Sequence, residues 1–94
     1  MKTVTIQIGN SDDKLTQCEW SEYVRAIQEQ IEIYAYDQHF FGGSPTWFPW
    51  QNVAWCIEMR DSKIEYLKQV IKSIGKKYKQ DSVAFTVGET EFIG

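Results

Sequence analysis

Two stretches of the chain repeat one pattern, and this repetition constrains the fold more than any other feature of the sequence. In each stretch, a segment of alternating apolar residues precedes a hydroxyl residue that is followed, three positions later, by glutamate. The two pairs are Thr16 with Glu19 and Ser62 with Glu65. Such a pair forms the capping box that begins a helix, whereas the alternation is typical of a strand with one buried face. The pattern predicts two strand-to-helix halves, residues 4–31 and 53–78.

The spacing of the apolar residues predicts six elements. Strands are expected over residues 2–8, around 38–41, over 53–59 and over 83–87. Helices are expected to begin at the two capping boxes, and the second is expected to end near Lys79. The solvent side of the first helix is predicted to carry Glu22, Arg25, Gln28, Glu29 and Glu32. The predicted core consists of the apolar side chains on the inward faces: Val4, Ile6, Ile8, Trp20, Val24, Ile27, Ile31, Trp55, Ile57, Ile64, Leu67, Ile71, Ile74, Val83 and Phe85.

The order strand, helix, strand, strand, helix, strand favours an α+β ferredoxin-like (βαββαβ) sandwich formed by a single domain, residues 1–94. Right-handed crossovers would place the first and third strands at the centre of an antiparallel sheet, with both helices on one face. The other face would carry small and polar residues: Thr5, Gln7, Ala54, Cys56, Glu58, Ala84 and Thr86. Because RNA-recognition domains of this fold expose aromatic side chains on the central strands, that use of the fold is disfavoured.

An aromatic segment, residues 45–56, contains three of the four tryptophans and both prolines. The prolines exclude residues 45–50 from a central strand, so a loop is expected there. Large aromatic loops either cover a core or anchor a partner, and the sequence leaves both alternatives open. In the second alternative the anchors are Trp47, Phe48 and Trp50.

The net charge of −3 conceals an uneven distribution of charge. Residues 62–79 carry six lysines against one glutamate, which gives +5, while the other four basic and twelve acidic residues give −8. The lysines either solvate an exposed helix face or form a surface for an acidic partner. Lys68, Lys72 and Lys76 represent this basic surface. Because the rest of the chain carries a net charge of −8, it would repel a polyanion, so duplex DNA is not an expected partner.

The turn after the first strand concentrates polar side chains: Asn10, Ser11, Asp12, Asp13 and Lys14. These residue types are typical of turns, because Asn and Asp bond to nearby backbone and tolerate left-handed conformations. Alternatively, Asn10, Ser11 and Lys14 could join Gln51 and Asn52 in a site for a nucleotide or other small anion, with an aromatic ring for stacking. The adjacent acids lack the spacing of a calcium loop.

Catalytic motifs are absent from the sequence: it contains no nucleophile elbow, P-loop, dinucleotide fingerprint or zinc-ligand spacing. Asp12, Asp13 and His39 are the only residues for which a catalytic role is defensible. We therefore predict no enzymatic activity, no metal and no cofactor. Cys18 and Cys56 are expected to be buried, reduced thiols. The sequence shows neither a membrane span nor a signal-peptide pattern, so a cytoplasmic protein is expected.

Three polar motifs carry a resemblance. The segments Gly9-Asn10-Ser11-Asp12-Asp13-Lys14-Leu15-Thr16-Gln17, Pro49-Trp50-Gln51-Asn52 and Tyr78-Lys79-Gln80-Asp81-Ser82-Val83-Ala84 together resemble a family of small uncharacterised proteins of bacteria and their phages. The resemblance implies a source but no mechanism. Our first hypothesis is a non-enzymatic binding protein, phage-encoded and directed at a host protein, with homodimerisation as a competing use of the same surface. The alternative hypothesis is a small-ligand protein that binds a nucleotide or other anion.

Overall fold

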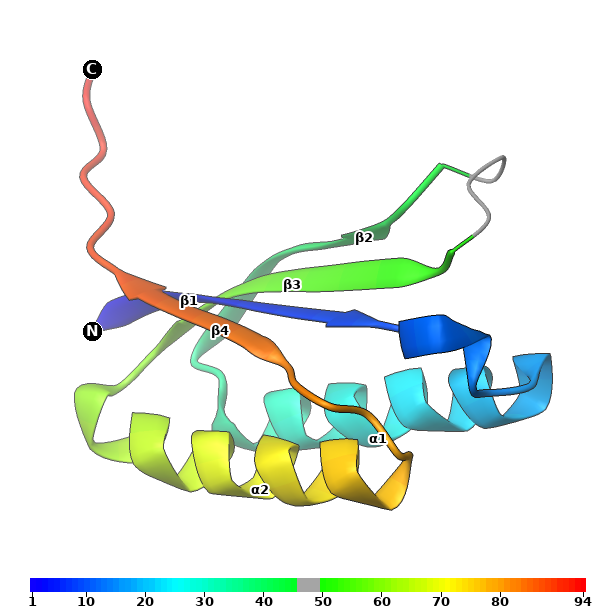
Figure 1. The fold of residues 1–94 in the computed structure, drawn as a ribbon. Helices are drawn as coiled ribbons and strands as arrows, with labels where there is room; N and C mark the ends of the chain where they lie inside the picture. Colours follow the sequence, from blue (N-terminus) through cyan, green and yellow to red (C-terminus); the bar gives the residue numbers. More distant parts are fainter. Residues whose placement is uncertain (46–49) are drawn as a thin grey trace.

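The computed structural model of this chain describes residues 1–45 and 50–94, and its elements follow the predicted order (Figure 1). The strands are β1 (Lys2–Gly9), β2 (Asp37–Gly43), β3 (Asn52–Met59) and β4 (Ala84–Gly88). The helices are α1 (Gln17–Tyr34) and α2 (Ile64–Lys77), and each follows a short 3-10 turn, η1 (Ser11–Asp13) or η2 (Asp61–Lys63). β2 is longer than the predicted 38–41, and β4 begins one residue after Val83.

The four strands form one sheet in the order β2-β3-β1-β4, and every neighbouring pair is antiparallel. β1 and β3 therefore lie at the centre, as predicted. Both helices cover one face of the sheet, so the chain is an α+β protein with one open face (Figure 1). The registers place Thr5 opposite both Cys56 and Thr86 on that open face. The central strands contribute no aromatic side chain to it; Phe40 of the edge strand β2, which pairs with Cys56, does.

The core lies between the sheet and the helices, and most of the predicted core residues are buried in it. Three buried hydrophobic side chains were not predicted: Leu15, Tyr23 and Met59. Four predicted core residues pack against the core but remain partly exposed: Val24, Ile74, Val83 and Phe85. The last two belong to the β4 segment, where α2 does not cover the sheet fully, and this partial cover has a functional consequence below.

The first capping box is confirmed. The backbone N–H of Glu19 donates to Thr16 Oγ1 over 3.2 Å, and the backbone N–H of Thr16 donates to Glu19 Oε1 over 3.0 Å. These hydrogen bonds, first that from the Thr16 backbone, lower the pKa of the Glu19 carboxyl below its ordinary value. Two orphan donors at the start of α1 are thereby satisfied.

The prediction of a second capping box, formed by Ser62 and Glu65, is wrong. The turn η2 closes when the Lys63 N–H donates to the Arg60 carbonyl over 2.9 Å, and α2 begins only at Ile64. Ser62 therefore lies inside the turn instead of at the N-cap, which is Lys63 and makes no side-chain capping bond. The helix ends at Lys77, near Lys79 as predicted. Lys79 adopts a left-handed φ of 60°, and bonds from Lys79 to Lys76 and from Gln80 to Gly75 complete a Schellman cap.

Three other side chains differ from their predicted environments. Cys18 is exposed, because it lies two positions before the buried Trp20 and two helical positions place side chains on nearly opposite sides of a helix. Cys56 is half-buried on the open face. Gln28 does not point simply to solvent: its Oε1 accepts a 2.7 Å hydrogen bond from Nε1 of the buried Trp55.

Within residues 1–45 and 50–94, neither helix has the length and apolar character needed to span a bilayer.

Tyr23 packs at the centre of α1 with its ring against Trp20 and stacked on Tyr78 at 5.2 Å. Among the described residues, its buried hydroxyl has no hydrogen-bond partner. Burial raises the pKa of Tyr23 to about 12, because the charged phenolate would lose its hydration. A buried hydroxyl without a partner costs free energy relative to an apolar group of the same shape.

We therefore expect Tyr23→Phe to leave the free energy of unfolding unchanged or to raise it by up to about 1 kcal/mol at neutral pH. The raised pKa adds a pH dependence: its contribution to stability is fully present below pH 10, the unfolded value, and is lost as the pH rises through about 12. Urea unfolding of both proteins at several pH values from neutral upward measures this. The difference should grow in favour of Tyr23→Phe above pH 10.

Candidate functional site

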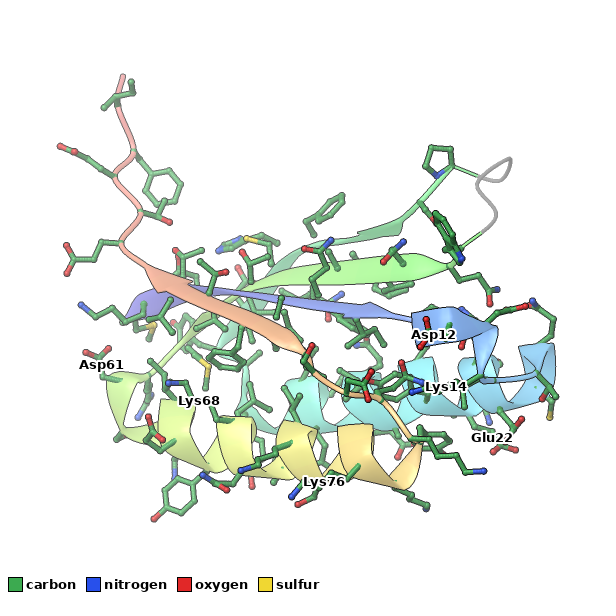
Figure 2. The ribbon with its side chains drawn as sticks, in the orientation of Figure 1. Asp12, Lys14, Glu22, Asp61, Lys68 and Lys76 are labelled. Atoms are coloured by element: carbon green, nitrogen blue, oxygen red, sulfur yellow. The ribbon has the colours of Figure 1, made fainter. Side chains whose placement is uncertain are left out.

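The three polar motifs meet at one end of the sheet. Because β1 and β3 are antiparallel, Gly9 at the end of β1 pairs with Asn52 at the start of β3, and the Asn10 N–H donates to the Gln51 carbonyl over 3.0 Å. The Lys14 ammonium reaches the connection between α2 and β4, 3.5 Å from the Asp81 carboxylate. Figure 2 shows Asp12 and Lys14 at this end of the molecule. This convergence follows from the antiparallel pairing of β1 with β3.

Asn10 is a structural residue of this turn. It is buried, its Oδ1 accepts from the Leu15 N–H over 3.0 Å, and its Nδ2 donates to the Leu15 carbonyl over 3.0 Å and to Asp13 Oδ1 over 3.3 Å. Asp12 and Asp13 both adopt left-handed φ values, 54° and 53°, a conformation that Asp tolerates. Ser11 belongs to η1, and only its backbone is described. Turn formation thus explains these residue types without a ligand.

The hollow beside this turn does not suit an anion. It measures about 480 Å³ and is lined by Gly9, Asn10, Asp12, Trp50, Gln51, Asn52 and Asp81. The carboxylates of Asp12 and Asp81 face it, and the nearby Lys14 ammonium is engaged by Asp81 and the Lys79 carbonyl. Gln51 Nε2 donates to Gln17 Oε1 over 2.9 Å. The local charge is therefore negative, and the small-anion hypothesis gains no support from the geometry.

His39 lies far from the two aspartates with which it could have acted. It lies in β2 beside Glu58, with its Nε2 3.4 Å from Glu58 Oε1, at the opposite end of β3 from Asn52. Asp12 and Asp13 lie beyond the Asn52 end. The described residues bring together no group of three His, Cys, Asp or Glu side chains that could hold a metal ion.

The aromatic loop is only partly described. Trp47 and Phe48 lie outside the described residues, so their predicted role as anchors stays a prediction. Trp50 is 60% exposed. Ser44 closes the connection between β2 and β3: its N–H donates to the Asn52 carbonyl over 2.9 Å, and its hydroxyl donates to the Trp50 carbonyl over 3.2 Å.

A groove between α2 and β4 combines the predicted lysine surface with apolar side chains. It measures about 270 Å³. Lys68, Lys72 and Lys76 line it, because residues four apart lie on one side of a helix (Figure 2 labels Lys68 and Lys76). Its apolar lining consists of Ile71, Gly75, Val83 and Phe85, and Gln80, Asp81 and Ser82 complete it. We call this the lysine groove.

One of these lysines lies directly over the apolar lining. The Lys68 ammonium lies 5.5 Å from the centre of the Phe85 ring, within the range of a cation–π contact. Lys68 also pairs with Glu65 at 3.3 Å, the only carboxylate within ion-pair distance of these three lysines among the described residues. An exposed pair of this kind contributes little. The groove therefore offers positive charge above an apolar floor.

β4 adds a second property to the lysine groove. In the part of the chain that the structure describes, it pairs only with β1 and forms an edge of the sheet. Edge strands present backbone N–H and C=O groups that can pair with another chain. A groove between an edge strand and a helix is where extended peptides add to a sheet in several peptide-binding domains.

No protein-family model matches the chain, and no curated protein matches it. The assignment of a function therefore rests on the geometry alone.

Sequence reasoning identified the lysines of this groove but not its floor. Val83 and Phe85 alternate as strand residues with a buried face, so they were predicted to belong to the core. Their partial exposure depends on how far α2 extends over β4, a distance between elements that a local pattern does not encode. The one available signal was the short final strand beside a lysine-rich helix face.

Proposed function

We propose that this chain is a non-enzymatic protein-binding module, and that the lysine groove holds an extended, acidic segment of a partner protein against the edge of β4. The observation that carries the proposal is the row Lys68, Lys72 and Lys76 along an apolar groove bordered by an edge strand. Backbone pairing with β4 would supply affinity that is independent of sequence. The lysines and the apolar floor would supply the selectivity.

The distance between successive lysines on α2 is close to the distance between alternate residues of an extended strand, and this match supports an acidic partner. Lysines one helical turn apart are separated by about 6 Å along α2. Alternate residues of an extended strand are separated by about 6.7 Å and point to the same side. Carboxylates at alternate positions of a bound segment can therefore meet successive lysines. An apolar residue at a further alternate position would lie on Ile71, Val83 or Phe85.

The proposal includes a ferredoxin-like fold, which the strand order β2-β3-β1-β4 and the antiparallel pairing support. It also includes a cytoplasmic setting, for which the free thiols of Cys18 and Cys56 are suitable. If the chain is phage-encoded, as the resemblance of its motifs implies, a protein of the host is one source of such an acidic segment. Duplex DNA is not the expected partner, because the chain outside residues 62–79 carries −8.

Fluorescence anisotropy with labelled peptides tests this proposal. The probe is a pool of extended peptides in which Glu occupies two successive alternate positions, Val, Ile or Phe occupies the next alternate position, and Thr lies between them. The matched control pool carries Lys in place of Glu. We expect the acidic pool to bind and the basic pool and a duplex DNA probe not to bind. Affinity should fall as salt rises, because exposed charge pairs are screened. Equal binding of both pools, or of neither, would contradict the proposal.

A further inference from the structure

The segment that follows β4 has the chemistry that the lysine groove requires. Residues 89–94 read Glu-Thr-Glu-Phe-Ile-Gly. In an extended conformation Glu89, Glu91 and Ile93 point to one side, which places two carboxylates and an apolar side chain at the alternate positions described above. Phe92 and Ile93 are 86% and 89% exposed. Both side chains are therefore available for burial against a partner.

This segment is directed away from the groove of its own chain. Lys2 Nζ pairs with Glu89 at 2.7 Å, and the hydroxyls of Thr3 and Thr90 are hydrogen-bonded. Thr3 lies on the open face, since its neighbour Val4 is buried beneath the helices. Figure 1 shows the chain after β4 leaving on the side of the sheet opposite the helices. The lysine groove lies on the helix side, so the segment and the groove of one chain face different directions.

We propose that residues 89–94 of a second copy of this chain occupy the lysine groove, and that two copies exchange these segments reciprocally. This inference rests on the proposed function, because it names a partner for the same groove. Each copy offers one groove and one acidic segment, so a two-fold arrangement fills both grooves and closes the assembly. Glu89 and Glu91 face the lysine row, and Ile93 covers the apolar floor.

The exchange replaces exposed contacts of residues 89–94 with contacts to the lysines and the apolar floor of the groove. Glu89 leaves an exposed pair with Lys2, and exposed ion pairs contribute little to stability. In return, the acidic segment enters the most basic part of a chain whose net charge is −3, and Ile93 loses contact with water. Association is therefore expected in spite of the like net charges of the two copies, and it should weaken as salt rises.

A charge-swap experiment tests the exchange. One variant carries Glu89→Lys and Glu91→Lys, and the other carries Lys72→Glu and Lys76→Glu. All four side chains are exposed, so both variants are expected to fold, which circular dichroism verifies. Sedimentation velocity over a concentration series should show a dimer for the unmodified protein and at least about tenfold weaker dimerisation for each variant alone. Mixing the two variants should restore the dimer, because both interfaces then pair opposite charges.

The control variant carries Glu22→Lys and Glu29→Lys on the exposed side of α1. These substitutions change the net charge by the same amount as Glu89→Lys with Glu91→Lys. It should dimerise like the unmodified protein. An unmodified protein that stays monomeric at all concentrations, or a dimer that neither variant weakens, would overturn the exchange.

A labelled peptide of residues 87–94 separates this inference from the proposed function. We expect it to bind the unmodified protein and not the Lys72→Glu, Lys76→Glu variant. If the acidic peptide pool binds and this peptide does not, the second copy is not the partner and the proposed function stands. If no acidic peptide binds, both fail.

Discussion

Replacing Trp55 with alanine is expected to lower the free energy of unfolding by about 3–5 kcal/mol, the usual cost of removing a buried tryptophan. Trp55 is 0% exposed, lies on β3 at the centre of the sheet, and contacts Phe41 with ring centres 5.4 Å apart. Its indole N–H also binds Gln28. Because small domains are stabilised by about 5–15 kcal/mol in total, this loss would bring the chain close to unfolding.

Urea denaturation followed by circular dichroism measures the effect. The matched control is Trp50→Ala, which removes a tryptophan that is 60% exposed and should change the free energy of unfolding by less than about 1 kcal/mol. Equal losses in the two variants, or a loss below about 1 kcal/mol for Trp55→Ala, would remove Trp55 from the core.

Replacing Lys68, Lys72 and Lys76 together with glutamine is expected to weaken binding of acidic peptides at least about tenfold. The three ammonium groups supply the positive charge of the lysine groove, and glutamine retains much of the side-chain length without the charge. The free energy of unfolding should change by less than about 1 kcal/mol, because these are surface substitutions that, among the described residues, break one exposed ion pair and one exposed cation–π contact of Lys68. Binding and stability are thus expected to separate.

The control triple variant carries Lys63→Gln, Lys77→Gln and Lys79→Gln. These lysines belong to the same basic segment but do not line the groove. Replacing them changes the net charge by the same amount as replacing Lys68, Lys72 and Lys76. Anisotropy titrations of both triple variants with the acidic pool measure the difference. If the control loses as much affinity as the groove variant, binding depends on overall charge and not on the groove.

The sequence predicted the elements well where the signal was local. Thr16 and Glu19 formed the capping box that their spacing indicates, whereas Ser62 and Glu65 carried the same signal and did not. The difference arises from the turn Asp61–Lys63, which moves the helix start past Ser62. α2 ends at Lys77, near the predicted Lys79, although Lys79, and not glycine, adopts the left-handed conformation of its Schellman cap.

The candidate site was only partly predictable, because its parts come from distant segments. The lysine row follows from helical spacing within one element. The floor does not, since it requires the position of β4 relative to α2. Likewise, turn chemistry predicted the conformations of Asp12 and Asp13, but the burial of Asn10 against Leu15 depends on contacts that the residue types alone do not specify.

The central claim is that partners bind in the lysine groove, and amide chemical shifts test it most directly. Two-dimensional ¹H–¹⁵N spectra of the labelled protein are recorded as the acidic peptide pool is added. The largest changes in amide chemical shift should occur at the residues that line the groove, above all Ile71, Gly75, Val83 and Phe85. Shifts concentrated at residues 9–14 and 50–52, or at Thr5 and Cys56 of the open face, would contradict the claim.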